Sequence, residues 1–150
     1  MKPWIRRNNL LAYTLQLALT ISPQPSLANP ISSLDSGVYA IQGKEGEPLI
    51  ALLRLSVSRT SYTMEGQHRG DFGWSVISCG QKCQYRESVK HEIEEYERPL
   101  AGIDLTSVNC IQNVAQAFCR IELSSGDYSQ YLLIALTGGK MIPVPLHRLE

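Results

Sequence analysis

The chain has 150 residues with 14 basic and 14 acidic side chains, and this length fits a single domain with a core of its own. Three of the basic residues lie within residues 1–28 and all of the acidic ones lie after them, so the rest of the chain carries 11 basic and 14 acidic residues, a net charge of −3. A weakly acidic domain without a cluster of Lys and Arg argues against nucleic acid or an anionic membrane surface as the partner.

The first 28 residues contain the three parts of a secretory signal peptide in the expected order. Basic residues supply the positive start. Residues 10–21 then form an apolar run that is shorter than the roughly 20 residues needed to span a bilayer. Small residues follow at Ser26 and Ala28, the two positions that a signal peptidase reads. We therefore predict cleavage after Ala28 and a periplasmic or secreted product.

The predicted product begins at Asn29 and has no membrane anchor. Because this residue is not a cysteine, lipid attachment of the bacterial lipoprotein kind is not expected. We assign residues 29–36 to an N-terminal tail and residues 37–150 to a single β-rich domain.

Alternating apolar residues predict two hairpins in the first half of the domain. Residues 37–42 and 49–58 form the strands of the first hairpin, on either side of a loop with two glycines. Residues 61–65 and 72–79 flank a glycine-bounded loop in the same way. Trp74 shares a face with the apolar residues two positions before and after it, so we expect it in the core or on a sheet face.

One segment has helical rather than strand spacing. Apolar residues three and four apart predict a short helix over residues 89–97, with Ser88 capping its start and Pro99 ending it. The glutamates of this segment would then face water.

The end of the chain predicts three further strands, over residues 117–123, 128–137 and 141–149. The middle one is apolar on both faces, which is typical of a strand that is covered on both sides. Pro143 and Pro145 both lack an N–H on one side of the last strand, and this pattern predicts an edge strand.

Together these elements predict a mainly β fold. We expect an antiparallel β-meander of roughly seven strands that closes as a barrel, half-barrel or sandwich, with one short helix near residues 89–97 and with disulfide staples. The strand covered on both faces favours a sheet with another layer packed across it.

Four cysteines, Cys79, Cys83, Cys110 and Cys119, all follow the predicted signal peptide, and an even number in an exported protein predicts disulfides. Of the three possible connectivities we expect the sequence-local one, Cys79 with Cys83 and Cys110 with Cys119, because a short segment with turn character separates the members of each pair. A thioredoxin-like redox site has two residues between its cysteines, whereas the first pair here has three. The spacings of the cysteines and of His91 fit no standard zinc site.

The acidic helix and the segment after the second cysteine form the predicted partner-binding surface. Its residues are Tyr85, Arg86, Glu92, Glu94, Glu95 and Glu97. A basic protein would complement this surface. His91 and Glu95 share a helix face and are metal-ligand types, but the second histidine of the zinc-protease pattern is missing, so a solvated face is favoured. We expect no metal and no cofactor.

No catalytic motif and no glycine-rich phosphate loop accompany the three histidines. The sequence therefore predicts an exported, non-enzymatic protein-binding module, such as an inhibitor, an immunity protein or an envelope accessory protein. An enzyme would instead show His68 or His91 beside a carboxylate in a cleft.

Residues 36–42 (SGVYAIQ) resemble the start of lipocalin-type barrels, with Tyr39 where that family favours Trp. The alternative function is accordingly a lipocalin-like carrier of a small apolar ligand. It predicts an internal cavity lined by residues such as Leu53, Leu55, Trp74 and Leu133. Size, export signal and disulfides are also similar to those of small periplasmic lysozyme inhibitors, but residues 124–131 (SSGDYSQY) depart in spacing from the Ser-Gly-x-x-Tyr pattern. We assign the chain to neither family.

Overall fold

The computed structural model describes residues 29–42, 49–59, 61–77, 84–126, 128–136 and 139–149. The predicted signal peptide lies outside the described residues, and so does the predicted Cys79–Cys83 disulfide. Both therefore stay predictions.

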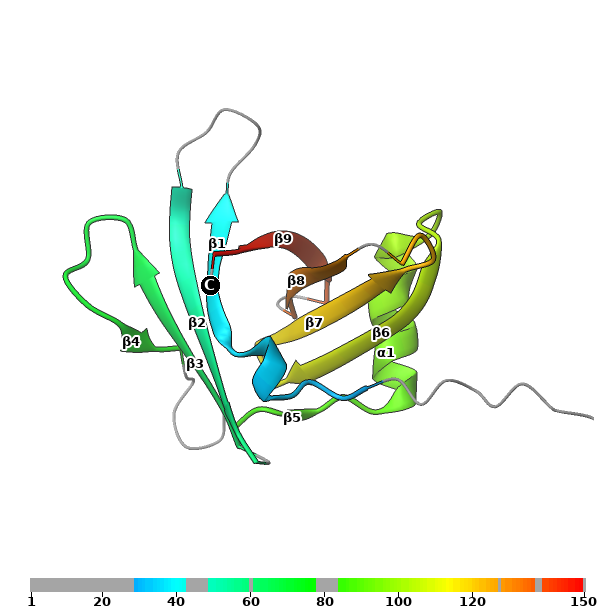
Figure 1. The fold of residues 1–150 in the computed structure, drawn as a ribbon, viewed down its shortest axis with the longest axis horizontal. Coiled ribbons are helices and arrows are strands. Elements are labelled where there is room, and N and C mark those ends of the chain that lie inside the picture. The colour runs from blue at the N-terminus through cyan, green and yellow to red at the C-terminus, as the bar shows by residue number, and fades with distance from the viewer. Residues whose placement is uncertain are drawn as a thin grey trace, which may run out of the picture.

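The described chain forms one antiparallel sheet that curls into a half-barrel (Figure 1). Its strands are β1 (Gly37–Gln42), β2 (Leu49–Ser58), β3 (Ser61–His68), β4 (Ser75–Val76), β5 (Arg86–Glu87), β6 (Leu105–Gln112), β7 (Gln116–Leu123), β8 (Ser129–Ala135) and β9 (Ile142–Arg148). The predicted mainly β meander is confirmed, and the half-barrel is the one of the three predicted closures that forms.

Two meanders make up the sheet, and the first and last strands join them. The strand order is β4-β3-β2-β1-β9-β8-β7-β6-β5. β1 pairs with β9 through residues 39–41 and 146–148, which is three residue pairs, whereas β2 and β3 pair through eight. With so short a backbone joint, side chains must supply much of the contact between the two halves of the sheet.

The prediction that residues 141–149 form an edge strand is wrong, because β9 lies between β1 and β8. The two prolines nevertheless limit its pairing. β8 pairs with β9 from Ile142 to Leu146, whereas the described part of β1 pairs with β9 only from Leu146 onward. Pro143 and Pro145 lack the N–H groups that continued pairing with β1 would need. Within the described residues, the pairing of β1 with β9 therefore stops before the proline half of β9.

Other strands also differ from the sequence prediction: β5 was not predicted, and β3 continues to His68 beyond the predicted residue 65. β6 has no predicted counterpart, because Asn109 and Gln112 interrupt the apolar alternation of its sequence, LTSVNCIQ, although both side chains are buried. Of the predicted strand over residues 72–79, residues 78 and 79 lie outside the described residues, and the described part forms a strand only at Ser75–Val76. Phe72 is fully exposed and Trp74 half-buried, so this segment does not contribute the expected core face.

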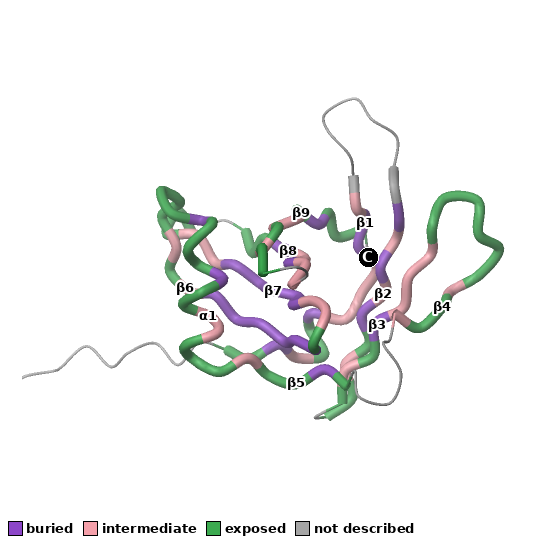
Figure 2. Tube along the Cα trace, turned by 180° about the vertical axis from the view of Figure 1, so that it is seen from behind, coloured by how far each residue is buried: buried purple, intermediate pink, exposed green. Residues whose placement is uncertain are grey.

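Buried side chains form two clusters, one on each face of the sheet. Figure 2 shows the buried residues (purple) along strands such as β6 and β7. On the inner, concave face, the rings of Tyr39, Phe118 and Tyr131 contact one another with centroids 4.9 to 5.6 Å apart. On the outer face, a helix packs Tyr96 and Leu100 against β6, β7 and β8. This second layer explains why the β8 sequence is apolar on both faces, as the sequence predicts.

The helix of the outer layer is α1 (Lys90–Glu97), which continues as the short 3-10 helix η2 (Arg98–Leu100). The predicted helix is confirmed, but its N-cap residue is Val89 rather than Ser88. The Glu92 carboxylate accepts the Val89 N–H at 2.9 Å, and the Ser88 hydroxyl donates to β6 instead.

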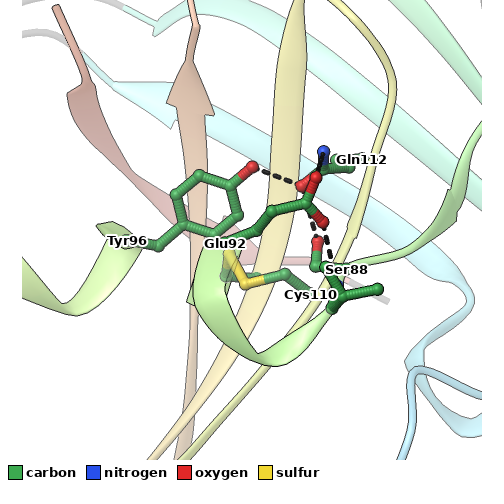
Figure 3. Close-up of a disulfide and its surroundings, with 7 residues drawn as sticks. Ser88, Glu92, Tyr96, Cys110 and Gln112 are labelled. Atoms are coloured by element: carbon green, nitrogen blue, oxygen red, sulfur yellow. Dashed lines mark hydrogen bonds between the residues drawn. A yellow bond between two sulfur atoms is a disulfide. The ribbon is translucent and has the colours of Figure 1, made fainter. Parts of the chain in front are cut away.

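A disulfide links Cys110 on β6 to Cys119 on β7 beneath this helix (Figure 3). The two residues are direct cross-strand partners with Cα atoms 4.1 Å apart. The predicted local pairing is confirmed for these two cysteines. Because disulfides persist where the environment is oxidising, this bond indicates an oxidising, non-cytoplasmic setting.

Residues 29–36, expected as a tail, pack against one end of the half-barrel. The 3-10 helix η1 (Ser33–Asp35) follows Ser32, whose N–H donates to the Asp35 carboxylate at 2.8 Å. Ile31 belongs to the inner core, and Asp35 is only 1% exposed. The segment therefore closes this end of the inner core.

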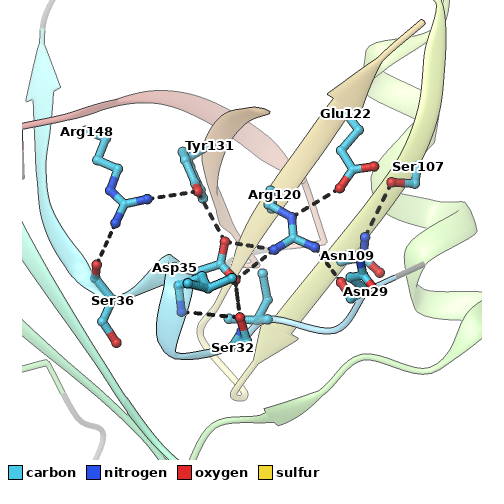
Figure 4. Close-up of polar contacts among 12 residues, drawn as sticks. Asn29, Ser32, Asp35, Ser36, Ser107, Asn109, Arg120, Glu122, Tyr131 and Arg148 are labelled. Atoms are coloured by element: carbon cyan, nitrogen blue, oxygen red, sulfur yellow. Dashed lines mark hydrogen bonds and ion pairs between the residues drawn. The ribbon is translucent and has the colours of Figure 1, made fainter. Parts of the chain in front are cut away.

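Arg120 of β7 forms an ion pair with Asp35 in this closed end (Figure 4). Its Nη1 donates to both carboxylate oxygens, at 2.9 and 2.8 Å, and its Nη2 donates to the Asn29 carbonyl. The hydroxyl of Tyr131 also donates to Asp35, at 3.1 Å, and that of Tyr39 donates to the Asp35 carbonyl. The Nε of Arg120 also approaches the partly exposed Glu122 carboxylate, at 3.5 Å. Since Arg120 is only 8% exposed, the closer and buried Asp35 carboxylate is its main compensation for desolvation.

We predict that Asp35→Asn lowers the free energy of unfolding by about 3 kcal/mol, because it leaves the buried Arg120 guanidinium with only its longer ion pair, at 3.5 Å to the partly exposed Glu122. Urea unfolding at neutral pH measures the loss. The double variant Asp35→Leu, Arg120→Met removes both charges and should recover most of the stability. Equal losses in the single and double variants would contradict this account of the pair.

We predict that replacing Cys110 and Cys119 together with Ala lowers the free energy of unfolding by about 2–3 kcal/mol, because the bond closes a loop with a sequence separation of 9. Urea unfolding should show a lower midpoint. An unchanged midpoint would mean that the strand pairing and α1 hold this region without the bond.

Candidate functional site

A groove of about 750 Å³ lies beside β8, β9 and the end of η2. Most of the residues that form its walls are apolar, and they include Leu100, Ile103, Leu132, Pro143 and Pro145. β8 and β9 place Leu132 opposite Pro145, so these two side chains share the outer face of the sheet. The helix layer covers β6 to β8, and the groove lies where this cover ends.

The turn after η2 brings Ile103 to the groove. Gly102 has a φ of 97°, a conformation that favours glycine, and the Ile103 N–H donates to the Leu100 carbonyl at 3.0 Å. This turn leaves Ile103 51% exposed. Tyr128, just before β8, also lines the groove and is 83% exposed. Two large apolar side chains therefore meet water at this site.

Acidic side chains stand next to the groove in the chain. Glu97 directly precedes η2 and Asp104 directly follows Ile103, and both are exposed. Over residues 90–104 the chain has five carboxylates and two basic side chains. We call the apolar lining, together with Glu97 and Asp104, the acid-rimmed groove.

Arg148 also lines the groove, but its charge is engaged elsewhere. Its guanidinium donates to the Ser36 carbonyl at 2.9 Å and to the Tyr131 hydroxyl at 3.4 Å (Figure 4). Arg148 therefore ties β9 to the closed end of the half-barrel.

Tyr85 and Arg86, two of the predicted partner-binding residues, are engaged within the protein. Tyr85 is buried in the inner core, and its hydroxyl donates to the sulfur of Met64 at 3.4 Å. Burial raises the pKa of Tyr85. Arg86 donates through both terminal nitrogens to Glu92, at 2.9 and 2.6 Å. We therefore leave Tyr85 and Arg86 out of the candidate site.

Glu92 connects α1 to the sheet (Figure 3). Besides Arg86, it accepts the Val89 N–H and, at 2.8 Å, the side-chain amide of Gln112 on β6. The Gln112 oxygen in turn accepts the hydroxyl of Tyr96. The hydrogen bonds from Arg86 are the main reason that the pKa of Glu92 falls from 4.5 to about 2. This carboxylate therefore holds the helix in place.

The other predicted glutamates, Glu94, Glu95 and Glu97, are exposed on α1. Glu94 has only a long ion pair with Lys90, at 3.8 Å between two exposed side chains. The structure thus places three of the predicted carboxylates where a partner can reach them. The apolar half of the site was not predicted from the sequence. Its sequence signal is the presence of apolar residues, such as Ile103, that belong to neither an alternating strand pattern nor a helical pattern.

The described residues include no group of three or more His, Cys, Asp or Glu side chains that could hold a metal ion. The Asp71 carboxylate does approach His68, but it accepts the main-chain N–H, at 3.1 Å. Among the described helices, none has the length and apolar character needed to cross a membrane.

The residues expected to line a carrier cavity do not surround a common space. Leu53, Leu55 and Leu133 pack in the inner core around its aromatic rings. Trp74 lies elsewhere, under the guanidinium of Arg54, whose carbon is 4.6 Å from the ring centroid. Trp74 therefore lies apart from the three leucines with which it was expected to line a cavity.

Comparison of the chain with protein families, with curated proteins and with solved structures finds no match. The function is therefore inferred from the geometry of the protein itself.

We predict that Glu92→Gln lowers the free energy of unfolding at pH 7 by about 1–2 kcal/mol, because it weakens the hydrogen bonds from Arg86. A carboxyl whose pKa is lowered by folding stabilises the protein above its unfolded pKa, and this stability is lost as the pH falls toward the folded value. The difference between wild type and variant should therefore shrink between about pH 4.5 and 2. Urea unfolding across this range measures it.

The matched control is Glu94→Gln, which removes an exposed carboxylate from the same helix. It should change stability by no more than a few tenths of a kcal/mol. A gap between wild type and Glu92→Gln that stays constant across the pH range would contradict the role given to Glu92.

Proposed function

We propose that the chain is an exported, non-enzymatic protein-binding module of a bacterial envelope, periplasmic or secreted, such as an inhibitor, an immunity protein or an envelope accessory protein. The signal-peptide features of residues 1–28 and the Cys110–Cys119 disulfide support export. The acid-rimmed groove is the proposed binding site. Its partner is another envelope or secreted protein that offers a basic segment with an apolar side chain.

The observation that carries this proposal is the exposed apolar surface at Ile103 and Tyr128, beside a groove with acidic neighbours. Single exposed apolar residues are ordinary, but apolar surface gathered around a hollow is typical of interaction sites. Covering it yields about 25 cal/mol for each Å² of apolar surface removed from water. The carboxylates favour a basic partner and speed its approach.

The arrangement of the residues expected to line a cavity favours protein binding over the carrier alternative. A lipocalin-like carrier needs an internal cavity of roughly 300 Å³ or more to enclose its ligand. Here Leu53, Leu55 and Leu133 belong to the packed inner core instead. The groove lies on the outside of the sheet and suits a protruding segment of a partner.

Selection of displayed random peptides on the immobilised protein tests the proposed site. We expect the enriched peptides to combine Lys or Arg with a neighbouring aromatic or aliphatic residue. Ile103→Ser and Glu97→Lys should each weaken binding of a selected peptide about tenfold, which corresponds to about 1.4 kcal/mol. Isothermal titration calorimetry measures the affinities.

Val114→Ser is the matched control for Ile103→Ser, because Val114 is also an exposed aliphatic residue but lies in the β6–β7 turn and is not part of the groove lining. It should leave peptide binding unchanged. Selected peptides without basic residues, or equal binding to the Ile103→Ser variant, would contradict the proposal.

A further inference from the structure

A second hollow, of about 380 Å³, lies at the turn between β7 and β8. Its polar walls come from Glu122 near the end of β7, Thr106 of β6, Ser124 of the turn and Ser129 of β8. Tyr128 and Ser129 line both this hollow and the acid-rimmed groove, so the two sites are neighbours. We call the hollow the β7–β8 pocket.

Backbone contacts shape the pocket before any partner is bound. The Gly126 N–H donates to the Leu123 carbonyl at 3.0 Å, and Gly126 has a φ of 75°, a conformation that favours glycine. The Ser124 N–H donates to the Asp104 carbonyl at 3.1 Å. A site whose backbone is already ordered loses less conformational entropy on binding.

Glu122 is the one charged side chain among the described residues that line the pocket. Its ion pair with Arg120 is long, at 3.5 Å, and the Nε of Arg120 forms no hydrogen bond in the described part of the chain. Arg120 has a closer and buried partner in Asp35, at 2.8 Å (Figure 4). The Glu122 side chain is 39% exposed. It can therefore bind a second cation while Arg120 keeps its main counter-charge.

We propose that the β7–β8 pocket binds the guanidinium of an arginine side chain of the partner protein. This inference rests on the proposed function of the groove and specifies where the basic residue of the partner binds. The Glu122 carboxylate can accept two N–H groups of a guanidinium side by side. The hydroxyl oxygens of Thr106 and Ser124, which also line the pocket, can accept others.

The pocket suits arginine better than lysine. A guanidinium is planar, donates in fixed directions and stacks on aromatic rings, whereas an ammonium is a strongly hydrated point charge. The exposed ring of Tyr128 supplies an aromatic wall beside the carboxylate. This combination of groups favours the flat and less hydrated cation.

One short segment of the partner can fill both sites, because Tyr128 and Ser129 form part of both linings. The segment then places an apolar side chain in the groove and an arginine in the pocket, a few residues apart. The exposed Asp104, whose carbonyl is bound to Ser124, adds negative charge beside the pocket.

Nuclear magnetic resonance titration with N-acetylargininamide tests the pocket directly, using isotope-labelled protein expressed as the full chain in a bacterial host and purified in its oxidised form. The backbone amide signals of Ser124, Gly126 and Ser129 should shift as this probe is added. The uncharged citrulline analogue should cause no such shifts, and the lysine analogue should bind several-fold more weakly. An absence of shifts with the arginine probe, or equal shifts with the citrulline analogue, would overturn the proposal.

Two variants make the titration specific. Glu122→Gln should weaken binding of the probe at least tenfold, because it removes the counter-charge. Ser124→Lys places a competing cation in the pocket and keeps the carboxylate, so it should abolish the shifts even where Glu122→Gln disturbs the fold. Glu94→Gln removes an exposed carboxylate outside the pocket and should bind the probe as the wild type does. Binding that persists in either pocket variant, at a wild-type urea midpoint, would contradict the assignment.

A pair of peptides separates the pocket from the groove. A peptide selected on the groove is compared with the same peptide carrying citrulline in place of arginine. Ile103→Ser should weaken both peptides, whereas Glu122→Gln should weaken only the arginine peptide. Peptides that need Ile103 but bind equally well with citrulline would remove the arginine pocket and leave the proposed function standing. Probe binding in the pocket without any peptide that binds the groove would do the reverse.

Discussion

The buried ion pair between Asp35 and Arg120 is the interaction on which the rest of the structure depends. Asp35 is separated from β1 by a single residue, and Arg120 lies on β7, so the pair ties the first meander to the second. The backbone joint between them, β1 with β9, has only three residue pairs. A pair of charges that is nearly free of water is stable only in good geometry, which fixes the position of the N-terminal segment.

Side chains also connect β3 to the segment around β5, between which no backbone pairing runs in the described residues. Tyr62 donates to Glu87 at 3.2 Å, and Tyr85 donates to Met64 at 3.4 Å. The prolines of β9 also affect how the strands of the sheet pair. In the described residues the pairing of β9 with β1 stops where the prolines begin, and both prolines line the groove.

The sequence pattern correctly predicted those strands whose burial follows from the alternation of their own residues. The bounds of β1 and β2 agree with the structure because strict alternation specifies a half-buried strand. β6 escaped prediction because Gln112 is satisfied by partners on α1, which only the folded chain brings together. The candidate site was predicted only in part for the same reason. Exposed carboxylates can be recognised on a helix, whereas the groove collects η2, β8 and β9 from distant parts of the sequence.

The protein separates the residues that hold its fold from those that it offers to a partner. On α1, Glu92 is bound on three sides to Arg86, Val89 and Gln112, whereas Glu97 is exposed. On the inner face the aromatic residues form the core, whereas Phe72 is wholly in water. Exposed side chains such as Phe72 add little to stability, so the stability of the isolated fold does not explain their apolar surface. A binding role accounts for this exposed apolar surface. Substitutions there are expected to change association while the fold stays intact.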